Sequence, residues 1–67
     1  MPWMDQKAAQ LENQADRLMR EYRSIERRAA CRTGEARADL LERMVEIRFK
    51  HGELLTAITN LRTRSKI

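Results

Sequence analysis

The chain has 67 residues, of which 36% are charged and 4% are aromatic, and its formal net charge is +4. A chain of this length buries only about 60% of the surface that it exposes when unfolded, which limits it to one modest core. Two domains, a doubly wound sheet and an enclosed substrate cleft are thereby excluded. With two glycines and one proline among many strong helix formers, the composition favours helices over a β-barrel or sandwich.

The first half of the chain carries an uninterrupted heptad pattern of apolar residues. Their spacing alternates between four and three residues, which is typical of one face of a helix in a coiled coil. The positions are Met4, Ala8, Leu11, Ala15, Leu18, Tyr22, Ile25 and Ala29. The pattern predicts a first helix over residues 4–31.

A turn is expected at residues 32–35. Gly34 tolerates the left-handed backbone conformation that ends many helices. Thr33 or Gly34 can cap the following helix, and Glu35 and Asp39 place negative charge near its positive N-terminal end.

A second heptad pattern follows the turn and predicts a helix over residues 36–63. All but one of its positions are apolar, and the exception is His51, the single histidine of the chain. The positions are Leu40, Met44, Ile47, His51, Leu54, Ile58 and Leu61. Each predicted helix is about 40 Å long at 1.5 Å per residue.

A short loop between two helices of equal length folds them into an antiparallel hairpin. The predicted fold is therefore all-α, a single coiled-coil-like helical hairpin over residues 1–67, and the pairing of two hairpins into a four-helix bundle is left open. Pairing residues whose numbers add to 69 sets smaller residues against larger ones along the seam between the helices. A neighbouring register, with sums of 65 and 66, also satisfies the pattern. The seam is expected to contain Leu11, Leu18, Tyr22, Ile25, Met44, Ile47, Leu54, Ile58 and Leu61.

Several apolar residues lie outside this seam and form a candidate partner-binding edge. Leu41, Val45 and Phe49 recur every four residues on the second helix, and Leu55 and Met19 flank the seam. A chain this small, without a disulfide or a metal, rarely gains enough stability from its own core, so contact with another chain is expected. The alternative is that these residues widen the intramolecular core.

The sequence suggests no enzyme, no metal site and no cofactor. His51 has no second histidine or cysteine at ligand spacing and is expected to be a packed or pH-sensitive seam residue. Cys31, the single cysteine, cannot form a disulfide within the chain. It is either an incidental thiol or one made reactive by Arg28 and Arg32 nearby.

Arginines crowd the second half of the first predicted helix, at Arg17, Arg20, Arg23, Arg27, Arg28 and Arg32. Such a face can bind RNA through its phosphates. Acidic residues at i,i+4 spacing, as in Asp16 and Arg20, instead favour a solvated surface laced with charge. Nucleic-acid binding is therefore the alternative function, in the form of a Rop-like homodimeric helical hairpin that binds RNA or regulates a plasmid or phage process.

The location expected from the sequence is the cytoplasm, without membrane contact. The first residues lack the basic and apolar regions of a signal peptide, and no apolar run approaches the roughly 20 residues that a membrane span needs.

The chain resembles the small YscE-like co-chaperones of type III secretion, which are chains of similar length folded as antiparallel helical hairpins around a glycine-containing turn. The resemblance rests on the length, on the turn Thr33–Arg37 and on the end of the second helix, Leu54–Leu61. It implies a chaperone function in virulence: such a hairpin binds and stabilises a TPR-like chaperone, and the pair holds the needle subunit in the cytoplasm before export. The resemblance implies only a region of contact, the edge with Leu41, Val45 and Phe49, and a homodimer is a further state of the isolated hairpin.

Overall fold

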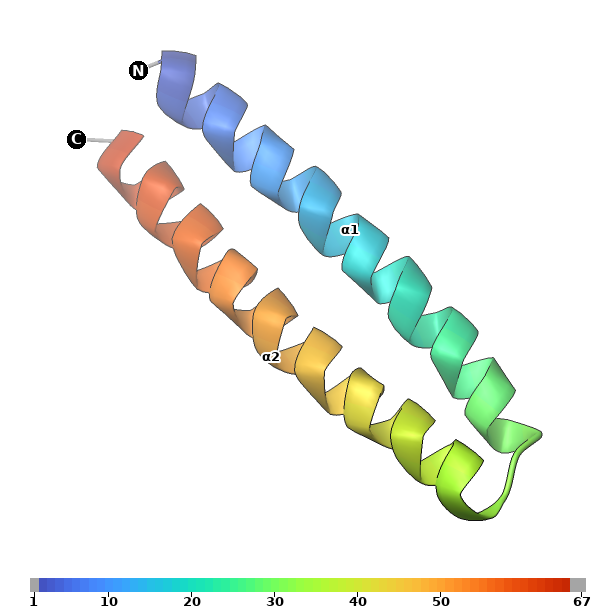
Figure 1. Ribbon diagram of the computed structural model, residues 1–67. Coiled ribbons are helices and arrows are strands. Elements are labelled where there is room, and N and C mark those ends of the chain that lie inside the picture. Colours follow the sequence, from blue (N-terminus) through green and yellow to red (C-terminus); the bar gives the residue numbers. More distant parts are fainter. Residues whose placement is uncertain (1, 66–67) are drawn as a thin grey trace.

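The computed structural model describes residues 2–65, which form two helices joined by a short turn. Helix α1 (Pro2–Ala30) and helix α2 (Gly34–Ser65) run antiparallel and side by side, so that the start of α1 and the end of α2 lie together at the end opposite the turn (Figure 1). The hairpin measures 51 × 14 × 11 Å along its principal axes. The prediction of an all-α helical hairpin is confirmed.

Both helices differ by one or two residues from their predicted bounds. Helix α1 starts at Pro2, because a proline needs no intrahelical partner for its nitrogen in the first turn and its fixed φ suits a helix. It ends before Cys31, whose backbone N–H donates to the carbonyl oxygen of Arg28 at 3.1 Å, while that of Arg32 donates to Ala29 at 3.2 Å. These i→i+3 bonds tighten the last turn and terminate the helix. The turn therefore occupies residues 31–33 instead of 32–35.

Gly34 allows the chain to reverse direction. Its φ is +64°, and within the described residues it is the one position with a positive φ. An L-residue with a side chain is strained in this conformation, whereas glycine adopts it freely. The predicted left-handed conformation at Gly34 is thus confirmed, and α2 begins at this residue.

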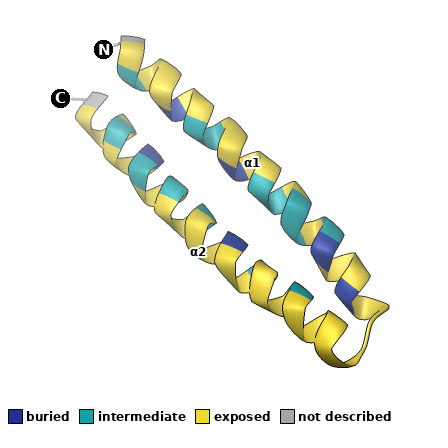
Figure 2. Cartoon of the chain, in the orientation of Figure 1, coloured by how far each residue is buried: buried dark blue, intermediate teal, exposed yellow. Residues whose placement is uncertain are grey.

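The core is a single seam along the facing sides of the two helices (Figure 2). Its fully buried members belong to the predicted heptad positions: Ala8, Ala15, Ile25, Ala29, Ile47 and Ile58. The small alanines come from α1 and let the isoleucines of α2 approach closely, which is how antiparallel helices interdigitate. The other predicted seam residues are half-buried, namely Leu11, Leu18, Tyr22, Met44, Leu54 and Leu61.

Two ion pairs between the helices support the predicted register. In the register with sums of 69, Glu21 lies opposite Arg48, and Glu12 lies opposite Ala57. Arg43 binds Glu21 and Arg62 binds Glu12. Arg43 therefore comes before Arg48 in the chain, and Arg62 comes after Ala57, by the same number of residues. Equal and opposite displacements are expected for pairs on the two flanks of one seam. In the alternative register with sums of 65 and 66 the displacements would be unequal.

Candidate functional site

Helix α2 has a second apolar face, on the side away from α1. Leu41, Val45 and Phe49 follow one another at intervals of four residues and are 41%, 67% and 71% exposed. At 3.6 residues per turn, this line starts at Leu41, about 100° around the helix from the neighbouring seam residue, and reaches nearly the opposite side at Phe49. We call these three residues the outer face of α2. Because Val45 and Phe49 are so exposed, they do not widen the core of the hairpin.

Leu55 and Met19 lie on the edge between the seam and this outer face. Each directly follows a seam residue, Leu54 or Leu18, just as Leu41 directly follows Leu40. Leu55 is 48% exposed, whereas Met19 is half-buried. Of the predicted partner-binding residues, Val45 and Phe49 therefore lie farthest from the seam, whereas Leu41, Leu55 and Met19 lie along its edge.

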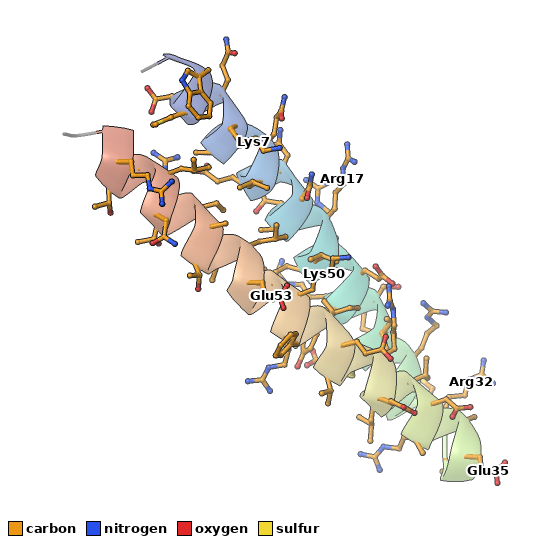
Figure 3. All side chains as sticks on the ribbon, turned by 60° about the vertical axis from the view of Figure 1, so that its left-hand side comes forward. Lys7, Arg17, Arg32, Glu35, Lys50 and Glu53 are labelled. Atoms are coloured by element: carbon orange, nitrogen blue, oxygen red, sulfur yellow. The ribbon has the colours of Figure 1, made fainter. Side chains whose placement is uncertain are left out.

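The outer face has charges of opposite sign on its two sides. Asp39, Glu46 and Glu53 recur every seven residues and line one side of it, and Arg48, one heptad after Leu41, lies on the other side. All of these residues are exposed, and Glu53 is labelled in Figure 3. The outer face is therefore an apolar strip with an acidic border and a partly basic border.

The ion pairs that the structure does form differ from those expected from i,i+4 spacing. Arg43 donates from Nη2 and Nε to Glu21 Oε1, at 2.9 and 3.2 Å, and from Nη1 to Glu46 Oε2 at 3.2 Å. The hydrogen bond to Glu21, followed by that to Glu46, raises the pKa of Arg43 above its ordinary value. Asp39, four residues before Arg43, takes no part in these bonds. Arg43 instead reaches across the flank of the seam to Glu21 and along α2 to Glu46.

A shallow groove of about 250 Å³ lies on the opposite edge of the hairpin from Met19 and Leu55. Leu18 and Leu54 form its apolar part, and Gln14, Arg17 and Lys50 complete it. Figure 3 shows Arg17 on α1 and Lys50 on α2. Sequence reasoning missed this groove, although the signal was present: seam layers with small residues such as Ala15 leave a larger partner like Leu54 partly uncovered.

The single histidine and the single cysteine lie in different environments. His51 is half-buried on the seam, and Cys31 is an exposed free thiol at the tip of the hairpin. Within residues 2–65, no three His, Cys, Asp or Glu side chains come together in a group that could hold a metal ion. No helix in this part of the chain is long and apolar enough to cross a membrane.

The arginines of α1 form an exposed basic surface. Arg17, Arg20, Arg23, Arg27 and Arg28 are all exposed. In the described part of the chain, the ion pairs are made by Arg43 and Arg62 of α2, so the charges of the α1 arginines are not neutralised by bound carboxylates.

Comparison of the chain with protein-family models, curated proteins and solved structures gives no match.

Proposed function

We propose that this protein is a non-enzymatic interaction module that presents the outer face of α2 to a partner protein. The observation that carries the proposal is the exposure of Leu41, Val45 and Phe49 in one line on a regular helix. Large apolar side chains grouped on a surface favour docking, because covering them removes apolar area from water. An amphipathic helix of this kind fits the apolar groove of an α-helical partner.

The partner that we propose is a TPR-like chaperone that holds the needle subunit of a type III secretion system in the cytoplasm. The helical hairpin, its length and its glycine turn support this proposal, as does the resemblance to YscE-like co-chaperones. In this function the hairpin stabilises the chaperone, and the chaperone itself binds the needle subunit.

A second candidate function is RNA binding by a Rop-like homodimeric hairpin. The observation that favours it is the exposed arginine surface of α1, which has no bound carboxylates in the described structure. Lysine and arginine side chains bind nucleic acid through phosphates, with an affinity that falls steeply as salt is raised.

The experiment that tests the proposal is co-purification of the tagged protein from its source cells, with nuclease treatment and a high-salt wash. Wild type is compared with Phe49→Glu, which places a charge on the outer face, and with Arg20→Glu, which reverses a charge on α1. We expect a stoichiometric helical-repeat protein, with or without a small needle-like subunit, to be retained by wild type and Arg20→Glu and lost with Phe49→Glu.

Two results would contradict the proposal. If the captured material is released by nuclease and by Arg20→Glu, the RNA-binding function is correct. If a helical-repeat protein is captured equally by Phe49→Glu, the partner docks elsewhere on the hairpin.

A further inference from the structure

We infer that, in the free protein, a second copy of this chain covers the outer face of α2, and that the two α2 helices pack against each other in parallel. The contact would place four helices in a row, because the outer face lies nearly opposite the seam. This inference concerns the isolated protein and uses the surface that the proposed function assigns to a partner, so a partner would have to displace the second copy.

The side of α2 that bears Val45 and Phe49 carries a heptad pattern of its own. Ala38, Val45, Gly52 and Thr59 recur every seven residues, and Phe49 stands between Val45 and Gly52 at the spacing of a coiled-coil core. Most of these side chains are small, so the axes of two helices can approach closely along the line, with Phe49 filling the space beside them. All five positions are exposed in the hairpin.

The charges decide the orientation of the second copy. In an antiparallel pair of helices, each flank meets the same flank of its partner, whereas in a parallel pair it meets the opposite flank. The antiparallel arrangement would bring the acidic border with Asp39, Glu46 and Glu53 against itself. The parallel arrangement instead brings Arg48 of each copy next to Glu53 of the other, at the spacing of interhelical ion pairs.

Arg48 and Glu53 are both available for this contact. Both are exposed, and neither takes part in an ion pair among the described residues. By symmetry the dimer gains the pair twice. Glu53 comes five residues after Arg48, and this offset brings the two side chains together across an interface only when the two helices run parallel.

Glu42 limits the contact at its N-terminal end. It occupies the core position one heptad before Phe49, and a parallel dimer brings the two Glu42 side chains together. Like charges in such a position weaken association. Replacement of Glu42 by glutamine therefore strengthens a parallel dimer. An antiparallel dimer centred on Val45 and Phe49 places Glu42 opposite Gly52, so the same replacement does not change its affinity.

The contact is small, so the association depends on concentration. A standard interface takes about 800 Å² from each partner, and the largest apolar patch of a typical monomer measures about 300–600 Å². Three exposed apolar side chains on one helix cover less than a standard interface. A reversible dimer that forms as the protein is concentrated is the expected behaviour.

Sedimentation equilibrium of the purified protein over a wide concentration range tests the inference without any partner. We expect a reversible dimer that Arg48→Glu weakens roughly tenfold, because two exposed ion pairs are each replaced by repulsion. The double variant Arg48→Glu with Glu53→Arg restores the affinity, and Glu42→Gln increases it. Circular dichroism checks that each variant keeps its helices.

A cysteine placed on the outer face tests the orientation. In a chain with Cys31→Ser and Ala38→Cys, a parallel dimer brings the new thiols together, and mild oxidation links the two copies. An antiparallel dimer centred on Val45 and Phe49 holds them roughly 27 Å apart at 1.5 Å per residue.

A protein that is monomeric at every concentration would overturn the inference. A dimer that does not form the Ala38→Cys link, or that the charge exchange does not restore, would overturn the parallel arrangement. These outcomes are independent of the proposed function, because capture of a helical-repeat partner is measured separately and with another variant.

Discussion

The two glycines, Gly34 and Gly52, differ in whether their backbone conformation requires a glycine. An added Cβ would meet no atom within 4 Å at either position, so the surroundings do not distinguish them. The backbone does, because Gly34 has a φ of +64° and Gly52 lies within α2. A methyl group is therefore strained at the first position and lowers the entropy of the unfolded chain at the second.

We predict that Gly34→Ala and Gly52→Ala change the stability in opposite directions. Gly34→Ala should lower the free energy of unfolding by about 1–2 kcal/mol, because an L-residue is forced into the left-handed region. Gly52→Ala should raise it by about 0.5–1 kcal/mol, since alanine is the better helix former. Urea unfolding of both variants at one low protein concentration measures this. A loss of stability with Gly52→Ala would show that the helix interior needs a glycine there.

At the scale of the element, the two helices differ in how their apolar residues are distributed. Helix α1 has one apolar face and an outer side of arginines, whereas α2 is apolar on its seam and again on its outer face. The seam of α2 packs against α1. The outer face does not, so another protein surface is needed to cover it, and this requirement underlies both the proposed function and the parallel dimer.

Arg43 joins α1 to α2 at the solvent-exposed flank of the seam. Its side chain is 50% exposed and that of Glu21 is 41% exposed, so salt screens the bridge. The pKa of Arg43 is raised, so the guanidinium remains charged at neutral pH, and its own contribution to stability is lost only as the pH rises through that raised value.

We predict that Arg43→Gln lowers the melting temperature slightly in dilute buffer and not in concentrated salt. Arg23→Gln, which removes an exposed arginine that binds no carboxylate among the described residues, is the matched control and should have no such salt-dependent effect. Thermal unfolding by circular dichroism at two ionic strengths compares them. An equal loss for Arg43→Gln at both ionic strengths would mean that the side chain acts through packing.

The heptad spacing was sufficient to predict both helices, the seam and the glycine turn, because each depends on local periodicity or on one backbone preference. The intervals of four between Leu41, Val45 and Phe49 likewise predicted an apolar surface off the seam. The partial burial of Met19 agrees with the alternative in which it widens the core, whereas the bridge from Arg43 to Glu21 was not predicted. That bridge depends on how far long, flexible side chains reach across the seam, and sequence spacing does not give that distance.

At the scale of the whole molecule, the hairpin is elongated and thinly packed. Its radius of gyration is 15.4 Å, compared with about 11 Å for a compact domain of this length. Few side chains are fully buried, because two helices share only one seam. A molecule of this shape has little stability of its own and much surface available for contact, which fits a module that works by association.

The central claim is that the seam of α2 stabilises the hairpin and its outer face mediates association. The most direct test is the free energy of unfolding in urea of wild type, Ile47→Ala and Phe49→Ala, each measured at low and high protein concentration. Ile47 is 1% exposed, so we predict that its truncation costs about 2–5 kcal/mol at both concentrations. Phe49→Ala should match wild type within about 0.5 kcal/mol at low concentration and lose the additional stability that wild type gains at high concentration. A Phe49→Ala variant as unstable as Ile47→Ala at low concentration, or a wild-type stability independent of concentration, would contradict the account.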